Sequence, residues 1–412
     1  MTTQAPSTVP RPRGGLLAAF AHRGFRLLWA GAFLSSVGTW TQDVALSWII
    51  HSRFGDPFYL GLRSFAQEVP LLAFMLVGGA AADRIDRRRI LLSSQGFQMA
   101  MAVLLGALYL TGHLGIAAIV LVAFATGLVQ SQSAPTYQAV ITSLVPRDAI
   151  ANAVALNSLQ FNLSRAIGPV LAGLLLAHAG AGWCFAANAV SFVGVILALQ
   201  TIAFPPPPTR PAESLGQSLR AGLRHVLDTP PLRAATLLAA AASFLAFPLI
   251  TYLPVIAGDV LETGASGYSL LLTSVGVGAI VGAIGTAQRG SVPGRGRLML
   301  LAFATFGLVT IGAALSRWQW LSMALLVGSG LTLTTAFSTL NSLVQEMAPD
   351  ALRGRVLSVF GLAFRGGGPF GSLVAGGLVR TAGAPAVMAA YAAVLLGVAS
   401  FLLLRGRELR TL

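Results

Sequence analysis

Lysine is absent from this chain of 412 residues, so all 27 basic residues are arginines, and only 13 residues are acidic. Charged residues make up 10% of the sequence and hydrophobic residues 55%. A soluble domain carries about 25% charged residues. A nucleotide-binding loop of the Gly-x-x-x-x-Gly-Lys-Ser/Thr type needs a lysine, which excludes ATP hydrolysis by such a loop. We therefore expect a membrane protein that is not an enzyme and that binds no cofactor.

Cysteine is almost absent as well. The single cysteine, Cys184, permits neither a disulfide within the chain nor a thiolate metal site. Residues 1–15 are polar, proline-rich and basic, and they lack the apolar core of a cleavable signal peptide. The histidines fall at the predicted ends of apolar runs or in loops, which predicts no metal cluster. They are His22, His51, His113, His178 and His225.

Long apolar runs dominate what remains. Runs of about 20 apolar residues cross a bilayer as helices, whereas a membrane barrel would show alternating segments of about ten residues. The sequence therefore predicts an all-α polytopic membrane protein whose partner is the lipid bilayer. Its twelve predicted transmembrane helices cover residues 26–50, 59–82, 90–111, 115–140, 152–177, 182–203, 233–257, 267–288, 298–316, 319–344, 355–380 and 385–404.

The arginines are distributed unevenly between these spans. With the N-terminus in the cytoplasm, 21 arginines fall in cytoplasmic segments and three, Arg53, Arg317 and Arg380, fall outside. Cytoplasmic loops of membrane proteins carry the excess of basic residues, so both termini are predicted to be cytoplasmic. The net charge of +14 then reflects topology, and no nucleic-acid partner is expected. The arginine-only, alanine-rich composition favours the cytoplasmic membrane of a bacterium.

A linker divides the spans into six and six. The prolines that begin at Pro205 stop a helix, and residues 213–227 then follow an amphipathic pattern that suits the cytoplasmic membrane surface. We predict an N-terminal six-helix bundle with its tail over 1–203, a linker over 204–232 and a C-terminal bundle over 233–412. The apolar face of the linker helix comprises Leu215, Leu219, Leu223 and Val226, opposite Arg220 and Arg224.

The two halves repeat weakly. Residues 127–146 and 330–349 each run from a glycine to a proline nineteen positions later, and RAIGP at 165–169 matches RGGGP at 365–369. Each half therefore carries one arginine three residues before a Gly-Pro pair. Two pseudo-symmetric six-helix bundles with a central site between them are the arrangement found in many transporters.

One loop carries the strongest family signature. GGAAADRIDRRR, residues 78–89, resembles the major facilitator loop Gly-x-x-x-Asp-Arg-x-Gly-Arg-Arg/Lys, with Asp86 in place of the second glycine. The residues that match the motif are Gly79, Asp83, Arg84, Arg87 and Arg88. By this resemblance, they form a cytoplasmic gating loop whose arginines pair across the inner ends of the bundles. The alternative is that these arginines only enforce topology.

Three further stretches resemble the exporter branch that includes the enterobactin exporter and related secretion effector permeases. They are GTWTQDVALSW (38–48), RAIGPVLAG (165–173) and PDALRGRVLSV (349–359). The resemblance implies secondary active export of small organic molecules, which we expect to be drug- or siderophore-like. Because the sequence has no nucleotide site, an ion gradient is the expected energy source, and we expect a monomeric chain that exports by alternating access in exchange for protons. An importer or lysolipid flippase of the same fold is the alternative. A non-transporting scaffold or sensor is the alternative of another class.

Charged side chains inside spans are costly and usually face a bundle interior or an aqueous cavity. Asp43 and Glu68 lie roughly 10–14 Å below the outer face at 1.5 Å per residue, on neighbouring antiparallel spans. A carboxylate shielded from water takes up a proton readily, so both are candidates for proton coupling. The alternatives are hydration at the rim or a structural pair with Arg63. Asp259 and Glu262 are the reserve candidates.

Arg165 and Arg365 lie near the middle of their spans. Each could bind an anionic group of the substrate or a carboxylate counter-ion, or tie helices together. The Gly-Pro pair that follows each one predicts a bent helix with close approach to a neighbour.

Uncharged polar residues on spans four and five are candidates for lining the cavity. Asn157, Gln160 and Ser164 share a helix face, which Asn162 does not. The fourth span offers Gln130, Gln132 and Tyr137. Hydrogen bonds between helices are the commoner role of such residues. Candidate aromatic walls, with lipid contact or core packing as the alternative, are Trp48, Phe65, Phe161 and Phe247.

Overall fold

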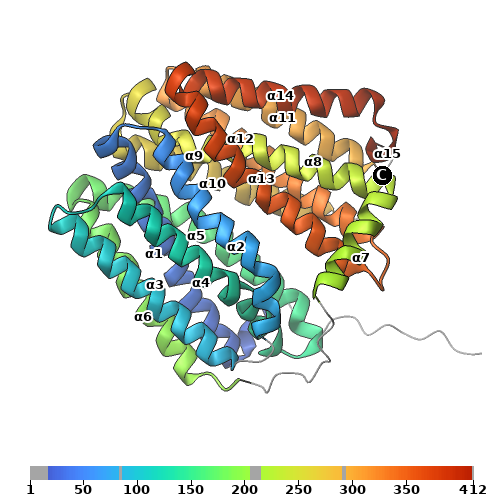
Figure 1. Cartoon of the computed structure of the whole chain (residues 1–412), viewed down its shortest axis with the longest axis horizontal. Helices are drawn as coiled ribbons and strands as arrows, with labels where there is room; N and C mark the ends of the chain where they lie inside the picture. Colours follow the sequence, from blue (N-terminus) through green and yellow to red (C-terminus); the bar gives the residue numbers. More distant parts are fainter. Residues whose placement is uncertain (1–16, 83–85, 205–214, 290–293, 411–412) are drawn as a thin grey trace, which may run out of the picture.

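Helices form almost the whole of the computed structural model, which describes residues 17–82, 86–204, 215–289 and 294–410 (Figure 1). Before the linker come α1 (Arg23–Ile49), α2 (Phe58–Ala82), α3 (Arg87–Leu110), α4 (Ile116–Ser143), α5 (Ile150–His178) and α6 (Ala181–Thr201). After it come α8 (Pro230–Ala246), α9 (Pro248–Val255), α10 (Gly264–Arg289), α11 (Arg295–Leu315), α12 (Gln319–Met347), α13 (Arg353–Ala382) and α14 (Ala384–Arg405). A short α15 (Arg407–Arg410) follows.

Nine helical segments within the described residues are long and apolar enough to cross a membrane. They comprise α3 to α6, the segment from α8 to Val260, α10 to α12, and α14. The other three long helices, α1, α2 and α13, have 27, 25 and 30 residues. These three carry four of the five predicted intramembrane charges, namely Asp43, Arg63, Glu68 and Arg365.

The predicted seventh span, 233–257, is not one continuous helix. Helix α8 ends at Ala246, and α9 begins at Pro248, whose nitrogen has no hydrogen to donate to the preceding turn. A π-helical turn, η4 (Ile256–Val260), follows α9, and a similar turn, η2 (Ile50–Phe54), follows α1. By contrast, α5 and α13 continue through Pro169 and Pro369.

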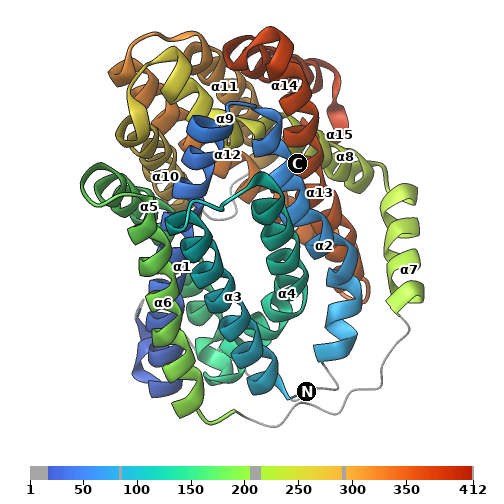
Figure 2. The same cartoon turned by 60° about the vertical axis from the view of Figure 1, so that its left-hand side comes forward.

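The long helices pack in an order that recurs after the linker. In the first helix group, α1 to α6, the helix pairs in contact include α1 with α5, α2 with α4, and α3 with both α4 and α6. In the second helix group, α8 to α14, the corresponding pairs are α8 with α13, α10 with α12, and α11 with both α12 and α14. Helices α2 and α13, and α5 and α10, join the groups. Figures 1 and 2 show the groups side by side.

The linker contains helix α7 (Leu215–Asp228), which packs against α13. A Cβ added to Gly222 would lie 2.6 Å from the carbonyl oxygen of Arg355, so the two backbones approach closely. Val226 is buried at this contact, whereas Leu223 is exposed. Part of the predicted apolar face therefore packs against the second helix group.

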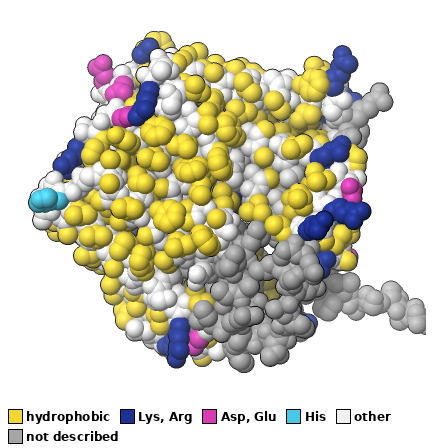
Figure 3. Space-filling view, viewed as in Figure 1, with side chains coloured by type: hydrophobic (Ala, Val, Ile, Leu, Met, Phe, Trp, Pro, Cys, Tyr) yellow, Lys and Arg dark blue, Asp and Glu magenta, His cyan; other side chains and the backbone are white. Residues whose placement is uncertain are grey.

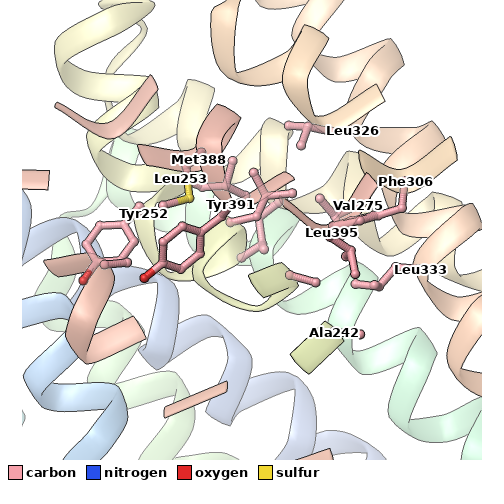
Figure 4. Packing of buried hydrophobic residues seen from close by; sticks show 14 of the residues in the cluster. Ala242, Tyr252, Leu253, Val275, Phe306, Leu326, Leu333, Met388, Tyr391 and Leu395 are labelled. Atoms are coloured by element: carbon pink, nitrogen blue, oxygen red, sulfur yellow. The ribbon is translucent and has the colours of Figure 1, made fainter. Parts of the chain in front are cut away.

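The outer surface is apolar between two charged margins. Figure 3 shows hydrophobic side chains spread over the face in view, with arginines and carboxylates gathered toward its edges. Exposed large side chains include Leu237, Phe401 and Leu404. A soluble monomer rarely exposes an apolar surface of this extent. The second helix group also has a closely packed interior, which includes Leu253, Val275, Phe306 and Leu326 (Figure 4).

Candidate functional site

A cavity of about 170 Å³ lies where α1 and α2 of the first helix group meet α9 and α10 of the second. Ligand pockets usually measure about 300–1,000 Å³, so a large organic molecule would require these helices to separate further. Both predicted proton carriers, Asp43 and Glu68, line this cavity. The lining comprises Trp40, Asp43, Val44, Ser47, Leu60, Arg63, Ser64, Gln67, Glu68, Ile250, Thr251, Tyr268 and Leu272.

Asp43 on α1 forms an ion pair with Arg63 on α2. The Arg63 guanidinium also donates a hydrogen bond of 3.3 Å to the Ser47 hydroxyl, one helical turn after Asp43. The side chains are 29% exposed for Asp43 and 13% for Arg63, so the pair is shielded from bulk solvent but reached from the cavity. The pairing that the sequence offered as an alternative is therefore formed, and the charge of Asp43 is balanced.

Glu68 lies on α2 in the same cavity, where it is partly buried. The charged groups within its electrostatic reach are Arg365 on α13 and Asp43 on α1. Arg365 is exposed. The two carboxylates thus share one cavity but have different cations, one from the same helix group and one from the other.

A second cavity, of about 40 Å³, lies inside the first helix group behind the ion pair. Amide side chains dominate its polar lining. Asn188 Nδ2 donates a 2.9 Å hydrogen bond to Gln42 Oε1, and Gln130 Nε2 donates one of 3.3 Å to Gln98 Oε1. A space that admits one probe sphere of about 10–15 Å³ can hold a water molecule. Since Asp43 and Arg63 line both cavities, their ion pair separates two polar spaces.

The predicted cavity residues of span five lie elsewhere. Gln160 donates hydrogen bonds of 3.2 Å to the carbonyl oxygen of Ala32 and 2.9 Å to the hydroxyl of Ser36. Ser164 is also buried against α1. Neither residue lines the two cavities described above, and the alternative role, hydrogen bonding between helices, is what they perform in this conformation. Asn157 is partly buried, and its Oδ1 has no partner among the described residues.

The span-four candidates and the aromatic candidates are scattered. Gln130 lines the second cavity, Gln132 is exposed, and Tyr137 packs in the core near the opposite end of α4. The aromatic side chains lie in separate contacts: Trp48 stacks on Tyr268, Phe65 meets Phe370, Phe161 meets Trp40, and Phe247 joins a cluster with Phe337 and Phe364.

Sequence reasoning missed several residues of the larger cavity. Gln67 is adjacent to Glu68, and Ser47 follows Asp43 by four residues on the same helix face, so helical spacing could have identified both. Tyr268 and Thr251 come from the second helix group. No signal in the sequence indicated that these two would face the carboxylates.

One ion pair and one histidine–carboxylate contact join the helix groups at the end predicted to face outside. Arg380 on α13 pairs with Asp56, and its guanidinium lies 4.7 Å from the centre of the Phe58 ring. The bond from Arg380 lowers the pKa of Asp56 below its usual 3.8. His51 Nε2 lies 3.4 Å from Asp259 Oδ1. Burial lowers the pKa of His51 below its usual 6.5, and the Asp259 charge opposes that effect.

The same end is closed by close backbone contact between α2 and α13. A Cβ added to Gly61 would lie 2.4 Å from the carbonyl oxygen of Ser372 and 2.6 Å from the Tyr252 hydroxyl. That hydroxyl donates a 2.7 Å hydrogen bond to the same carbonyl. In Figure 4, Tyr252 lies beside Tyr391. Glycine at position 61 is therefore what allows the groups to meet here.

At the opposite end, no ion pair between described residues joins the two helix groups. Arg295 pairs with Glu346 on the neighbouring helix. Arg88 donates to the carbonyl oxygen of Gln200 on α6, and its own backbone N–H is capped by Asp86 at 2.8 Å.

The gating-loop prediction falls partly outside the described residues. Asp83 and Arg84 lie there, and Gly79 is known only as part of α2. Arg87 begins α3. Within the described ranges, no cluster of histidine, cysteine and carboxylate side chains could hold a metal ion.

Comparisons with known proteins extend over nearly the whole chain. The sequence profile of the transmembrane secretion effector family matches residues 14–411. The staphyloferrin A transporter of Staphylococcus aureus is 25% identical over 372 residues, which cover 86% of this chain and 91% of that protein. The enterobactin exporter of Citrobacter koseri is 28% identical over 397 residues, which cover 93% and 92% of the two chains.

Solved transporter structures share the fold. A bacterial homologue of the lysosomal transporter Spinster superposes with a TM-score of 0.69 at 17% identity, covering 94% of this chain and 98% of its own. A D-xylose–proton symporter superposes with a TM-score of 0.72 at 14% identity, covering 91% and 96%.

Proposed function

Because the chain belongs to the transmembrane secretion effector family of major facilitator transporters, we propose that it exports small organic molecules in exchange for protons. As a member of this family it is a multi-pass membrane transporter and not an enzyme. The direction of transport, the coupling ion and the substrate class are the parts that we propose.

The proposed topology has twelve spans in two six-helix bundles. The nine apolar segments, together with the long charged helices α1, α2 and α13, supply the twelve. The repeated packing order supports two bundles, with the linker that contains α7 between them. The arginine distribution favours cytoplasmic termini, and relatives such as the enterobactin exporter favour the inner membrane of a bacterium. We propose that the chain acts as a monomer.

Export is supported by the enterobactin exporter, one of the similar proteins. We therefore propose a siderophore-like or drug-like substrate that moves out of the cytoplasm. An importer or a lysolipid flippase would use the same fold in a different direction or on a different substrate. A scaffold or sensor would need neither a cavity between the helix groups nor charged residues lining it.

The observation that carries the coupling proposal is the shared cavity of Asp43 and Glu68. Two carboxylates at one cavity repel each other when both are ionised, so one of them binds a proton more readily. Protonation of Asp43 would release Arg63, and protonation of Glu68 would remove its attraction to Arg365. Either event changes how strongly the helices around the cavity hold together, which is how a bound proton can bias alternating access.

The contacts at the two ends support an inward-open conformation. In the described residues, the Arg380–Asp56 ion pair and the His51–Asp259 contact join the groups, and both lie at the predicted outer end. We propose that they break when the protein opens outward. The loop residues Asp83, Arg84, Arg87 and Arg88 would then close the inner end, as the family motif implies.

The test uses inside-out membrane vesicles and labelled enterobactin or staphyloferrin A as probes. Wild type should accumulate at least one probe when a pH gradient, acidic inside, is imposed. Asp43→Asn or Glu68→Gln imitates the protonated carboxyl with little change of shape, and at least one should abolish accumulation while exchange of probe down its gradient continues. Asp148→Asn, at an exposed carboxylate of the same helix group, is the control and should accumulate probe as wild type does.

Accumulation by both single variants and by the double variant at the wild-type level would exclude both residues from coupling. Asp259 and Glu262 would then be the next carboxylates to substitute. Accumulation in the absence of any pH gradient would contradict proton exchange itself.

A further inference from the structure

Arg165 is an intramembrane cation without a matching anion. It lies on α5, and none of the ion pairs between described residues includes it. Its Nε is inaccessible to solvent and has no hydrogen-bond partner in the described part of the chain. Its guanidinium carbon lies 5.9 Å from the ring centre of Trp40. Arginine is always charged, so this cation cannot relieve its burial by losing a proton.

Its counterpart in the repeat has a different environment. Arg365 is exposed and lies within electrostatic reach of Glu68. Both arginines stand three residues before a Gly-Pro pair, but among the described residues a carboxylate lies within electrostatic reach of Arg365 and none pairs with Arg165. A structural role common to both arginines therefore does not explain why an arginine stands at position 165.

The position of Arg165 connects it to the cavity between the helix groups. Helix α5 packs against both α1 and α10 here: a Cβ on Gly168 would lie 2.4 Å from the Cβ of Trp40, and one on Gly276 would lie 3.1 Å from the Cα of Ala166. Trp40, whose ring faces the guanidinium, is itself part of the cavity lining with Asp43 and Glu68. The arginine thus stands at the junction of α1, α5 and α10, beside the cavity.

We infer that Arg165 and Trp40 form a binding site for a planar organic anion, such as a carboxylate carried on an aromatic ring. A guanidinium presents parallel N–H donors that match the two oxygens of a carboxylate. The indole face provides a flat apolar surface for the ring that carries the carboxylate. A bound anion would also supply the charge that Arg165 lacks, and an uncompensated charge in a low-dielectric setting is costly. The substrate of the proposed export would accordingly be anionic.

This inference rests on the proposed transport function, but its test measures binding without any gradient. Purified protein in lipid nanodiscs is titrated with radiolabelled benzoate and, separately, with benzamide, its uncharged analogue of nearly the same shape. Wild type should bind benzoate at least about tenfold more tightly than benzamide, a difference of about 1.4 kcal/mol. A failure of this preference leaves the carboxylate test of proton coupling unaffected.

The variants assign the preference to one side chain. Arg165→Gln should bind both probes equally, and Arg165→Lys should keep a reduced preference because its charge remains without the planar fork. Trp40→Leu should weaken the binding of both probes. Arg224→Gln, at an arginine of α7 whose side chain is 85% exposed, is the control and should retain the preference for benzoate. Binding is compared only for variants that elute as a single species in gel filtration. If Arg165→Gln does not elute in this way, Arg165→Lys and Trp40→Leu decide the outcome.

Three results would overturn the inference. They are equal affinities of wild type for the two probes, no measurable benzoate binding to wild type, and a full benzoate preference in Arg165→Gln.

Discussion

The two helix groups share a packing order but present opposite chemistry to the cavity between them. The first group contributes Asp43, Arg63 and Glu68, with an amide-lined space behind them. The second contributes uncharged side chains, namely Ile250, Thr251, Tyr268 and Leu272. The interior of the second group holds a set of aromatic contacts that includes Phe247, Phe303, Phe337, Phe360 and Phe364. A repeated backbone therefore does not imply a repeated function.

From this difference we propose a division of labour between the helix groups, in which the first exchanges protons and the second contacts the substrate. Groups that gain and lose a proton need polar neighbours and access to water, which the first group provides. A wall that accepts varied organic molecules needs apolar and aromatic surface, which the second group provides. Movement of the second group against the first would then couple the two events.

Breaking the ion pair of the first group should have the largest effect. Arg63→Met leaves the Asp43 carboxylate without its cation and should lower the free energy of unfolding by about 1–3 kcal/mol, less than for a fully buried pair because the Asp43 side chain is 29% exposed. The variant should also lose transport driven by a pH gradient. The double variant Arg63→Met with Asp43→Asn should recover the stability and not the transport. Thermal unfolding and vesicle uptake measure the two quantities.

Arg224→Met is the matched control for the Arg63→Met stability measurement. Arg224 pairs with Asp228 on α7, where the side chains are 85% and 69% exposed. Such exposed pairs contribute between about 0 and 1 kcal/mol, so this variant should unfold almost as wild type does. If Arg63→Met lowered the free energy of unfolding as little as Arg224→Met does, the Asp43–Arg63 pair would be as well hydrated as a surface pair. The proposed difference between the two helix groups would then be wrong.

Truncating the aromatic interior of the second group should reduce stability without changing coupling. Phe303 is completely buried and meets Phe337 edge-on. Phe303→Ala should lower the unfolding free energy by about 2 kcal/mol, which is less than in a water-soluble core because lipid also solvates an exposed ring. The pH dependence of the remaining transport should match wild type. Phe401→Ala, at an exposed position of α14, is the control, and an altered pH profile in Phe303→Ala would contradict the division of labour.

The helices themselves could be predicted from the sequence, because apolar length and arginine placement depend on local composition. The break at Phe247 could not, since Pro169 and Pro369 sit in unbroken helices and the same residue type at 248 begins a new one. In the site, helical rise placed Asp43 and Glu68 at a similar height on neighbouring helices, and both line one cavity. Which polar face of α5 meets α1, and which of two equivalent arginines has a carboxylate near it, depend on contacts between distant segments.

The contacts at the end predicted to face outside did not follow from the sequence. Each group supplies one carboxylate and one base: Asp56 pairs with Arg380, and Asp259 pairs with His51. None of these residues belongs to a motif, and Asp259 was considered only as a reserve proton carrier. The two bridges differ in their base, which makes them respond to pH differently.

The smallest expected effect is a pH dependence of outer closure that comes from His51 alone. Burial lowers the pKa of His51 below 6.5 in the closed end, so the closed form binds fewer protons than an open form with an ordinary histidine. The contribution of His51 to closure is therefore fully present above about pH 6.5 and declines as the pH falls toward the lowered value. The Arg380 bond holds the pKa of Asp56 below 3.8, so the Asp56–Arg380 contribution is present above about pH 3.8 and is lost only in stronger acid. Acidification from pH 7.5 to 5.5 should thus weaken closure by the His51–Asp259 contact and leave the Asp56–Arg380 ion pair intact.

Opening is measured with Leu272→Cys, which lines the cavity, in a Cys184→Ser background, as the rate of labelling by a membrane-impermeant maleimide added outside. The labelling rate is normalised to that of a thiol at the exposed Trp318→Cys. It should rise less than about tenfold on acidification, because only one pH unit lies between the ordinary histidine pKa of about 6.5 and pH 5.5, and one unit corresponds to a factor of ten. His51→Gln should show no such rise, whereas Asp56→Asn should label faster at both pH values and keep the rise. A rise that persists in His51→Gln would assign the pH response to the carboxylates of the first group, and closure at the outer end would then be governed from the cavity.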